Sequence, residues 1–337
     1  MASPLFRIGA RGSKLSLAQT EQTRARLAAQ LGAAVEMLEI VPIVTSGDRI
    51  QDRKLIEAGG KGLFTKELDE ALLDGRIDLA VHSLKDLPTH LPDAIALACV
   101  PEREDPRDAF VSLKAKTLAE LPAGANIGTS SLRRQAQALF ARPDLRPVTL
   151  RGNVDTRLKK LEAGEADATF LALAGLKRLR IEARASSLVD PHATPPAACQ
   201  GAIAITARAD DARVRDALAA CEDAAARVEI EAERAFLAAA IHHRYTKAQP
   251  HHAEAYLRLL SDERQVAAAA LGAALRLGAD LSGRSEFLLS AFEIRVVDER
   301  LVLRVKKKMA HLVTEIGTRR LEAAAQALGL EAEMKIT

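Results

Sequence analysis

The sequence predicts an α/β protein built from two similar lobes, and two observations support this fold class. Apolar strand patterns alternate with helical patterns between Phe6 and Arg208, an order typical of sheets with crossover helices. In addition, a helix end, a glycine, an aspartate and a buried strand follow one another twice, at 74–78 and at 163–167. We therefore expect two α/β lobes facing a shared cleft, because ligands of open α/β sheets lie where the strands end.

Composition narrows the class of protein. A chain of 337 residues predicts two or three domains. The net charge of +3 and the scarcity of aromatic residues argue against a nucleic-acid partner, which needs a basic surface and stacking side chains. The cysteines Cys99, Cys199 and Cys221 lack CxxC spacing, which favours a reducing compartment. Without a signal-peptide core or a span-length apolar run, we expect a cytoplasmic protein with no membrane partner.

The strand and hinge signals give the expected domain limits. Strands are predicted at 5–8, 36–45, 77–81, 95–100, 109–113, 125–128, 147–150, 169–173 and 202–207. Pro42 indicates an edge or a bulge, and residues 46–49 indicate a turn. Charged residues at 101–106 and prolines at 195–196 suggest hinges, after which strand 202–207 could return to the first sheet. The expected domains are 1–101 with 200–220, 102–199 and 221–337.

The glycine-rich stretch at 59–66 has to be compared with the pattern of a phosphate-binding loop. A Walker loop requires a glycine five residues before its Gly-Lys pair and Ser or Thr after the lysine. Leu55 and Gly62 occupy those positions, so the nucleotide hypothesis fails. What remains is a flexible loop that can bring Lys61 and Phe64 over the cleft.

Two strand ends carry polar groups that could do chemistry. The strand at 77–81 leads to the polar residues His82, Ser83, Lys85 and Asp86. Asp86 is either an acid–base group or a cap of the turn before the following proline. Arg11 and Ser13 lie between the first strand and its helix. They form either an anion site at a helix start or a solvated arginine and a plain N-cap.

Three arginine groups in the second lobe give the clearest chemical signal. They follow three successive predicted strands, at 130–134, 151–157 and 175–178. Guanidinium groups pair with carboxylates or phosphates, although single surface arginines are usually only solvated. Together with Arg11, the three groups favour a ligand with several negative charges.

Several motifs together resemble the porphobilinogen deaminase family, also called hydroxymethylbilane synthases. The resemblance covers residues 6–208 and rests on the stretches 8–15, 59–67, 80–88, 128–135, 150–158 and 174–178. It implies two lobes like those of periplasmic binding proteins, with mixed sheets, plus a smaller C-terminal α+β domain. The family condenses porphobilinogen units into a linear tetrapyrrole with loss of ammonia, on a dipyrromethane cofactor held by a cysteine thioether.

The resemblance also implies roles for single residues. Asp86 would be the catalytic carboxylate, and Lys61 and Phe64 would belong to a loop over the cleft. Gln200 matches the hinge region, where Cys199 replaces the usual glycine of the family. The expected partner is porphobilinogen, bound by a monomer. The cofactor-binding residues would be Arg11, Ser13, Ser83, Lys85, Arg133, Arg134, Arg151, Arg157, Arg178 and Gln200.

The last part of the chain departs from the family pattern. Counting from the helix around Ala235, Arg244 stands where the family carries the cofactor cysteine, and arginine cannot form a thioether. Three interpretations stay open: an enzyme whose anchor moved to Cys199 or Cys221, a homologue that only binds pyrroles or other polycarboxylates, or a scaffold with a replaced last domain. Strands at 292–297 and 301–305 and a helix at 315–328 are predicted there. The histidines at 242, 243, 251 and 252 lack metal-ligand spacing, so no metal site is predicted.

Overall fold

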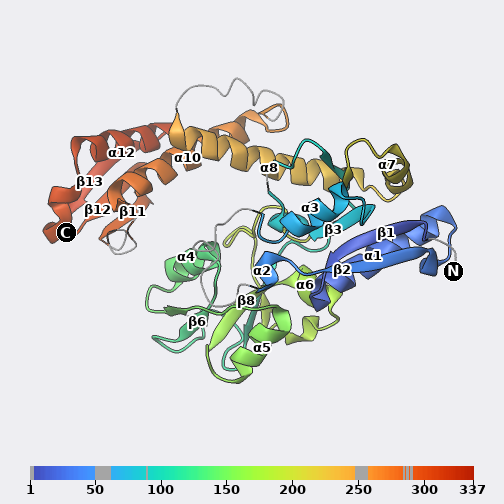
Figure 1. Cartoon of the computed structure of the whole chain (residues 1–337). Coiled ribbons are helices and arrows are strands. Elements are labelled where there is room, and N and C mark those ends of the chain that lie inside the picture. Colours follow the sequence, from blue (N-terminus) through green and yellow to red (C-terminus); the bar gives the residue numbers. More distant parts are fainter. Residues whose placement is uncertain are drawn as a thin grey trace. The chain divides into compact units, whose positions relative to one another are not determined.

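A computed structural model describes residues 4–49, 62–88, 90–246, 257–283, 285, 288 and 291–337. The chain divides into two compact units, Met1–Val228 and Glu229–Thr337 (Figure 1). The boundary falls inside one helix, α8 (Ala224–Tyr245), a few residues beyond the limit expected from the sequence. No helix among the described residues is long and apolar enough to cross a membrane.

The first sheet contains the strand that returns from the second lobe, as predicted. Its order is β2-β1-β3-β10-β4, with β10 antiparallel to both neighbours and β1 parallel to both of its own. The edge position of β2 agrees with the edge that Pro42 indicated. The strands are β1 (Phe6–Arg11), β2 (Leu38–Ile43), β3 (Leu79–Ser83), β4 (Ile95–Cys99) and β10 (Ile203–Arg208).

The second sheet has the same plan. Its order is β7-β6-β8-β5-β9, with β6 parallel to β7 and β8, and β5 antiparallel to β8 and β9. The predicted α/β class with two mixed sheets is therefore confirmed. The exact lobe limits at 101 and 199 stay a prediction. The strands are β5 (Asp108–Ser112), β6 (Asn126–Gly128), β7 (Arg146–Val148), β8 (Ala168–Ala172) and β9 (Ser187–Leu188).

The internal repeat seen in the sequence has a structural counterpart in the aspartate that precedes the central strand. Asp78 donates its N–H to Arg7 O at 2.9 Å and accepts the Arg7 N–H on Oδ2 at 2.7 Å. Asp167 makes the same exchange with Asn126, at 2.9 and 2.7 Å. Because a carboxylate closes the end of each parallel pair, both lobes set the register of their central strands in the same way.

The helices of the first unit begin where the sequence predicted helix starts. Side-chain oxygens of Ser13, Ser131 and Asn153 accept backbone N–H groups of the first turn, which stabilises a helix by about 1 kcal/mol per cap. Residues 46–49, expected as a turn, form one helical turn. The helices are α1 (Lys14–Leu31), α2 (Ser46–Arg49), α3 (Lys66–Leu73), α4 (Leu132–Ala141), α5 (Val154–Glu162), α6 (Leu173–Arg178) and α7 (Ala212–Ala219), with 3-10 turns at Val35–Met37, Leu84–Asp86 and Glu182–Arg184.

The second unit is an α+β arrangement of its own. The predicted hairpin is confirmed as β11 (Phe292–Val297) and β12 (Arg300–Val305), and the predicted closing helix as α12 (Glu315–Ala327). A third strand, β13 (Glu331–Ile336), pairs in parallel with β12. The long helix α10 (Asp262–Ser282) was not predicted; its Leu277 and Leu281 share a buried core with β12 and α12. A 3-10 segment spans Lys307–Leu312.

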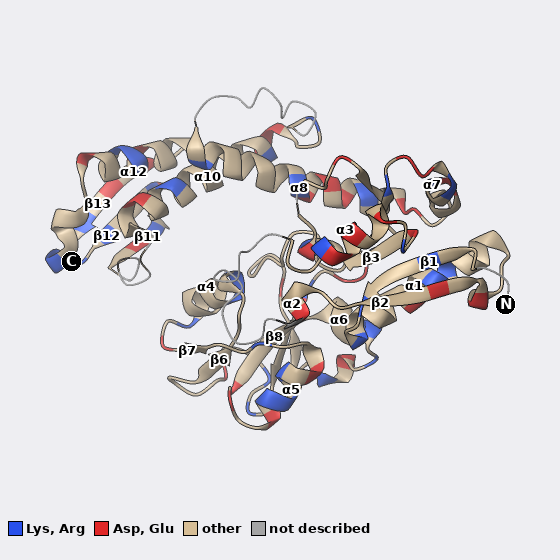
Figure 2. Cartoon of the chain, viewed as in Figure 1, with Lys and Arg blue, Asp and Glu red and all other residues tan. Residues whose placement is uncertain are grey.

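The charges on this second sheet are of both signs (Figure 2). Glu293 on β11 lies 3.6 Å from Arg304 on the neighbouring β12, and Lys335 lies 3.1 Å from Glu333 on the same strand, β13. Exposed pairs of this kind contribute little stability each. They give the sheet a mixed surface rather than a basic one.

Loss of the Asp78 carboxylate is expected to destabilise the first unit. Asp78 is 6% exposed and accepts hydrogen bonds from the backbone and guanidinium of Arg7, with Arg213 at 3.4 Å. Asp78→Asn should lower the free energy of unfolding by about 2 kcal/mol, a value reduced for the partial exposure of both arginines. Denaturant titration at neutral pH measures this, with Asp74→Asn as an exposed control; equal midpoints would contradict it.

The same carboxylate predicts a pH dependence. Burial alone would raise the pKa of Asp78, but the Arg7 hydrogen bonds and the charges of Arg7 and Arg213 hold it below its usual value. The stabilisation is therefore complete above the unfolded pKa of about 3.9 and is lost as the pH falls through the lower folded value. Asp78→Asn and the unchanged protein should accordingly converge in stability as the solution is acidified.

Candidate functional site

Asp86 and Lys85 lie on a single 3-10 turn that follows β3 directly. The turn is fixed by Leu84, which is 1% exposed and donates its N–H to Ala202 O at 3.0 Å. Asp86 is exposed, whereas the ammonium of Lys85 is partly buried against the side chain of Gln200. The described residues include no hydrogen-bond partner for the Asp86 carboxylate, so it does not act as a cap of this turn. The end of β3 thus presents one carboxylate and one ammonium from an anchored backbone.

The residues just before this turn hold the strand end in place. His82 is buried, and its Nε2 lies 3.0 Å from Thr206 Oγ1 on β10. Burial, assisted by the charge of Arg11, lowers the pKa of His82 to about 4, so the ring is neutral near pH 7. Ser83 Oγ lies within 3.1 Å of the Gln19 amide on α1. His82 and Ser83 therefore join β3 to its neighbours.

Arg11, at the end of β1, is enclosed by two partners. Its guanidinium forms a bidentate pair with Asp48 and lies 4.2 Å from the centre of the Phe64 ring. Phe64 is thus placed over a cation of the predicted site, whereas Lys61 lies outside the described residues. Ser13 caps α1, which is the simpler of the two roles that the sequence allowed. A further role of Ser13 in ligand binding stays a prediction.

Asp108, which sequence reasoning did not single out, gathers several predicted site residues in the second lobe. Its carboxylate accepts from Arg133 Nη2 at 2.8 Å, from Arg134 Nη2 at 2.7 Å and from Gln200 Nε2 at 2.8 Å. Burial alone would raise the pKa of Asp108, but Arg134 and Arg133 hold it at about 2. Arg134 is itself 7% exposed and also donates to Phe170 O, so its guanidinium faces the protein interior.

Gln200 connects this group to the first lobe. Its Oε1 accepts from Lys85 Nζ at 3.1 Å, while its Nε2 donates to Asp108 and to Pro106 O. The surrounding protein desolvates the Lys85 ammonium, and Arg134 and Arg157 repel it, so its pKa falls to about 8 although Asp86 and Asp108 oppose this. Lys85, Asp86 and the second-lobe arginines therefore belong to one electrostatic cluster.

Arg157 and Arg151 complete the cluster. Arg157 donates Nε to Gly152 O at 2.8 Å, and its pKa is lowered to about 10 by burial and by the charges of Arg134 and Arg151, against the attraction of Asp86. Arg151 Nη1 is buried and has no hydrogen-bond partner among the described residues. A buried guanidinium N–H without an acceptor is costly. The cluster is therefore short of negative charge, as a site for an anionic ligand is.

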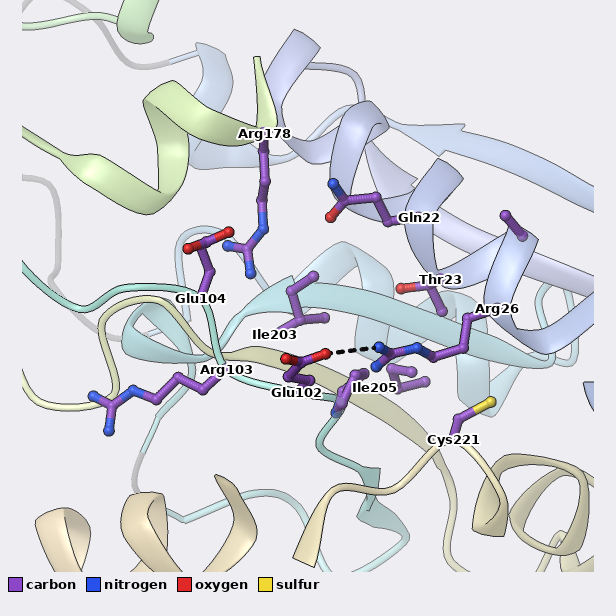
Figure 3. Close-up of a pocket in the computed structure, with 12 residues that line it drawn as sticks. Gln22, Thr23, Arg26, Glu102, Arg103, Glu104, Arg178, Ile203, Ile205 and Cys221 are labelled. Carbon is purple, nitrogen blue, oxygen red and sulfur yellow. Dashed lines mark hydrogen bonds and ion pairs between the residues drawn. The ribbon is translucent and has the colours of Figure 1, made fainter. Parts of the chain in front are cut away.

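Arg178 lines a cavity of about 440 Å³ beside the hinge (Figure 3). It donates Nη2 to Gly201 O at 2.7 Å, and burial lowers its pKa against the attraction of Glu104. Across the cavity, Arg26 pairs with Glu102 at 3.3 Å. The structure thus brings together Lys85, Asp86, Arg133, Arg134, Arg151, Arg157 and Gln200. Arg178 contacts Gly201, the neighbour of Gln200, and Arg11 lies close enough to His82 to influence it, with Phe64 against Arg11.

The thiols are all buried in the first unit. Burial, with Glu222 nearby, raises the pKa of Cys99 to about 12, and burial raises that of Cys221. A raised pKa disfavours the nucleophilic thiolate. Arg244 lies inside the last turn of α8, where its backbone N comes close to Gly272 of α10. Among the described residues no group of three His, Cys, Asp or Glu side chains is arranged to hold a metal ion.

Two mixed α/β sheets with a cluster of cations around Asp86 and Asp108 at their strand ends form a two-lobed scaffold of the kind expected for an anionic ligand. Residues 6–216 match the family model described as porphobilinogen deaminase, dipyromethane cofactor binding domain. Because the match covers more than half of the chain, this protein belongs to the porphobilinogen deaminase family. Residues 217–337, which include Arg244, lie outside the match.

Two relatives agree with the family model. A porphobilinogen deaminase of Caulobacter sp. (strain K31) is 62% identical over 216 residues, which cover 63% of this chain and 68% of the relative. One from Phenylobacterium zucineum (strain HLK1) is 58% identical over 215 residues, covering 62% of this chain and 67% of the relative. A periplasmic substrate-binding protein of an ABC transporter from Coxiella burnetii aligns with a TM-score of 0.42 at 15% identity, over 68% of this chain and 97% of that one.

Proposed function

We propose that the chain is a hydroxymethylbilane synthase, a transferase of tetrapyrrole and haem biosynthesis that condenses porphobilinogen units into a linear tetrapyrrole with release of ammonia. The proposal includes a cytoplasmic monomer with the three domains expected from the sequence. Family membership supports it. The observation that carries it is the cluster in which Lys85 and Arg157 lie near the exposed Asp86 carboxylate, with Arg151 and Arg134 beside Arg157.

The cluster fits a dipyrromethane through its acid side chains. The buried Arg151 Nη1 without an acceptor and the depressed pKa of Arg157 both call for carboxylates. When bound, the cofactor supplies the terminal pyrrole to which the next unit is joined. The covalent anchor does not fit equally well, because the thiols are buried and counting along the chain puts Arg244 where the resemblance leads us to expect the cysteine. Cys221, which lines the hinge cavity, and Cys199 are the remaining candidates.

Within this proposal each residue has a role set by its position. Asp86 stabilises the positive charge that develops on the substrate pyrrole as ammonia leaves, and it can exchange the proton of that step. Lys85, Arg133, Arg151 and Arg157 orient the acetate and propionate groups. Arg134 supports them from the interior. Arg11, Ser13, Ser83, Arg178 and Gln200 complete the proposed binding set, and Lys61 and Phe64 the covering loop.

The binding-protein alternative remains the outcome to test against. The family model and the two relatives described above carry the enzyme's name, so they do not favour this alternative. Arg244 is its main support, because a homologue without an anchor could still hold a polycarboxylate.

One experiment separates the two functions. The protein is produced with porphobilinogen present and purified, and its mass is measured by mass spectrometry, both intact and after proteolytic cleavage. Ammonia release is then followed after porphobilinogen is added. We expect ammonia release and a mass increase of dipyrromethane size on a peptide containing Cys199 or Cys221. Replacing each cysteine by serine in turn identifies the anchor. An unmodified mass together with no ammonia, despite saturable porphobilinogen binding, would establish the binding protein instead.

A further inference from the structure

Asp108 occupies an unusual place in the site, because one buried carboxylate serves both lobes. Its side chain is 1% exposed and accepts hydrogen bonds from Arg133, Arg134 and Gln200. A buried carboxylate with three partners is stable only while those partners keep their geometry. Asp108 lies at the start of β5, in the segment that leads out of the hinge, and Gln200 lies in the segment that leads back.

The connection continues to the proposed catalytic turn. Gln200 is 1% exposed and has its amide orientation fixed, since its NH2 group donates to Asp108 Oδ1 and Pro106 O. Its oxygen is therefore directed at Lys85 Nζ, 3.1 Å away and next in sequence to Asp86. On the other side, Asp108 Oδ2 holds Arg133 Nη2, and Arg133 Nη1 donates to Gln137 Oε1 and Pro195 O, both at 2.8 Å.

We propose that Asp108 is the positioning residue of the site: together with the interior Arg134 it orients Arg133 toward the ligand's acid groups and, through Gln200, it sets the position of Lys85 beside Asp86. This inference rests on the proposed function and adds to it a residue that touches no ligand. A carboxylate is required because asparagine cannot accept from both arginines and the glutamine at once. Glutamine is required at position 200 because the same amide must donate on one side and accept on the other.

The test measures equilibrium binding of porphobilinogen by calorimetry in a double-mutant cycle, with every variant made in the Asp86→Asn background so that the substrate is bound but not turned over. Asp108→Asn is expected to weaken binding about tenfold to a hundredfold, the loss associated with charge-assisted hydrogen bonds. Because Asp108 acts through Arg133, the double variant with Arg133→Lys should bind no more weakly than the weaker single variant. Additive losses would overturn the proposal and indicate a purely structural role. Asp144→Asn, which alters the exposed Arg142 pair beyond the other end of α4, is the matched control and should bind normally.

A second readout does not depend on porphobilinogen. Lys85 faces Asp86, Asp108, Arg134 and Arg157 as its charged neighbours. Gln200→Leu leaves the Asp108–arginine pairs intact but removes the acceptor of the Lys85 ammonium. We expect an NMR titration to show the Lys85 pKa about 1 unit lower in Gln200→Leu, with a fall also in Asp108→Asn and none in Asp144→Asn. An unchanged Lys85 pKa in both variants would overturn the link, whereas failure of the unchanged protein to bind porphobilinogen would count only against the proposed function.

Discussion

Replacing Asp86 by asparagine is expected to lower turnover of porphobilinogen by about 10²- to 10⁴-fold, the usual contribution of a positioned acid–base group. Asparagine keeps the size of the side chain but can neither carry the negative charge nor exchange the proton. The folded protein should be unaffected, because Asp86 is exposed and its carboxylate has no hydrogen-bond partner among the described residues. Ammonia release at saturating substrate measures the effect.

The matched control for this variant is Asp93→Asn, an exposed aspartate on the loop before β4. It should retain full turnover and the same melting temperature. Porphobilinogen binding should survive in Asp86→Asn, since removing one negative charge from a site for carboxylates does not weaken the attraction of Lys85 and the arginines. Turnover above a tenth of the original rate would show that Asp86 lacks the proposed role.

The parts of the fold that sequence predicts are those governed by local rules. The caps at Ser13, Ser131 and Asn153 accept N–H groups three residues ahead, so their pattern is complete within four residues of sequence. The aspartates before β3 and β8 follow the same logic, because each lies at a fixed distance from the helix end that precedes it. The return of β10 to the first sheet was inferred from a buried strand after a proline-rich hinge.

The parts that sequence does not predict depend on partners far apart in the chain. Asp108 precedes a predicted strand without any local sign of function, and its partner Gln200 is 92 residues away. Arg133 and Arg134 are adjacent in sequence, yet the second is 7% exposed and the first is half-buried. Successive residues on a helix project about 100° apart, so the fold, not the motif, decides which arginine can reach a ligand.

In the second unit, too, sequence alone does not fix which residues correspond to those of the family. Its predicted hairpin and closing helix follow local patterns, but α10 is an alanine-rich helix whose sequence resembled no family motif. Residue 244 lies within a helix that packs against Gly272. A position built into a helix pair cannot be equated with a cofactor-bearing loop by counting residues alone, which is why the anchor must be found by experiment.

Gly201→Ala is expected to have the largest effect on stability. The backbone at Gly201 has φ +90°, and an added Cβ would lie 2.1 Å from Glu104 O on the opposite hinge segment. Neither backbone can move independently, because Glu104 N–H donates to Gly201 O at 3.3 Å and Arg178 Nη2 donates to the same oxygen. Backbone strain and overpacking together should lower the free energy of unfolding by about 4 kcal/mol.

Gly75→Ala separates the two causes. Gly75 also has a left-handed backbone, with φ +67°, but no atom lies within 4 Å of its added Cβ. It should cost only about 1 kcal/mol, the price of the backbone conformation. The difference between the two variants in denaturant midpoint therefore measures the close approach of the hinge segments. If Gly201→Ala were no less stable than Gly75→Ala, the two segments would have to separate freely, and Gly201 O could not hold Arg178 where the structure places it.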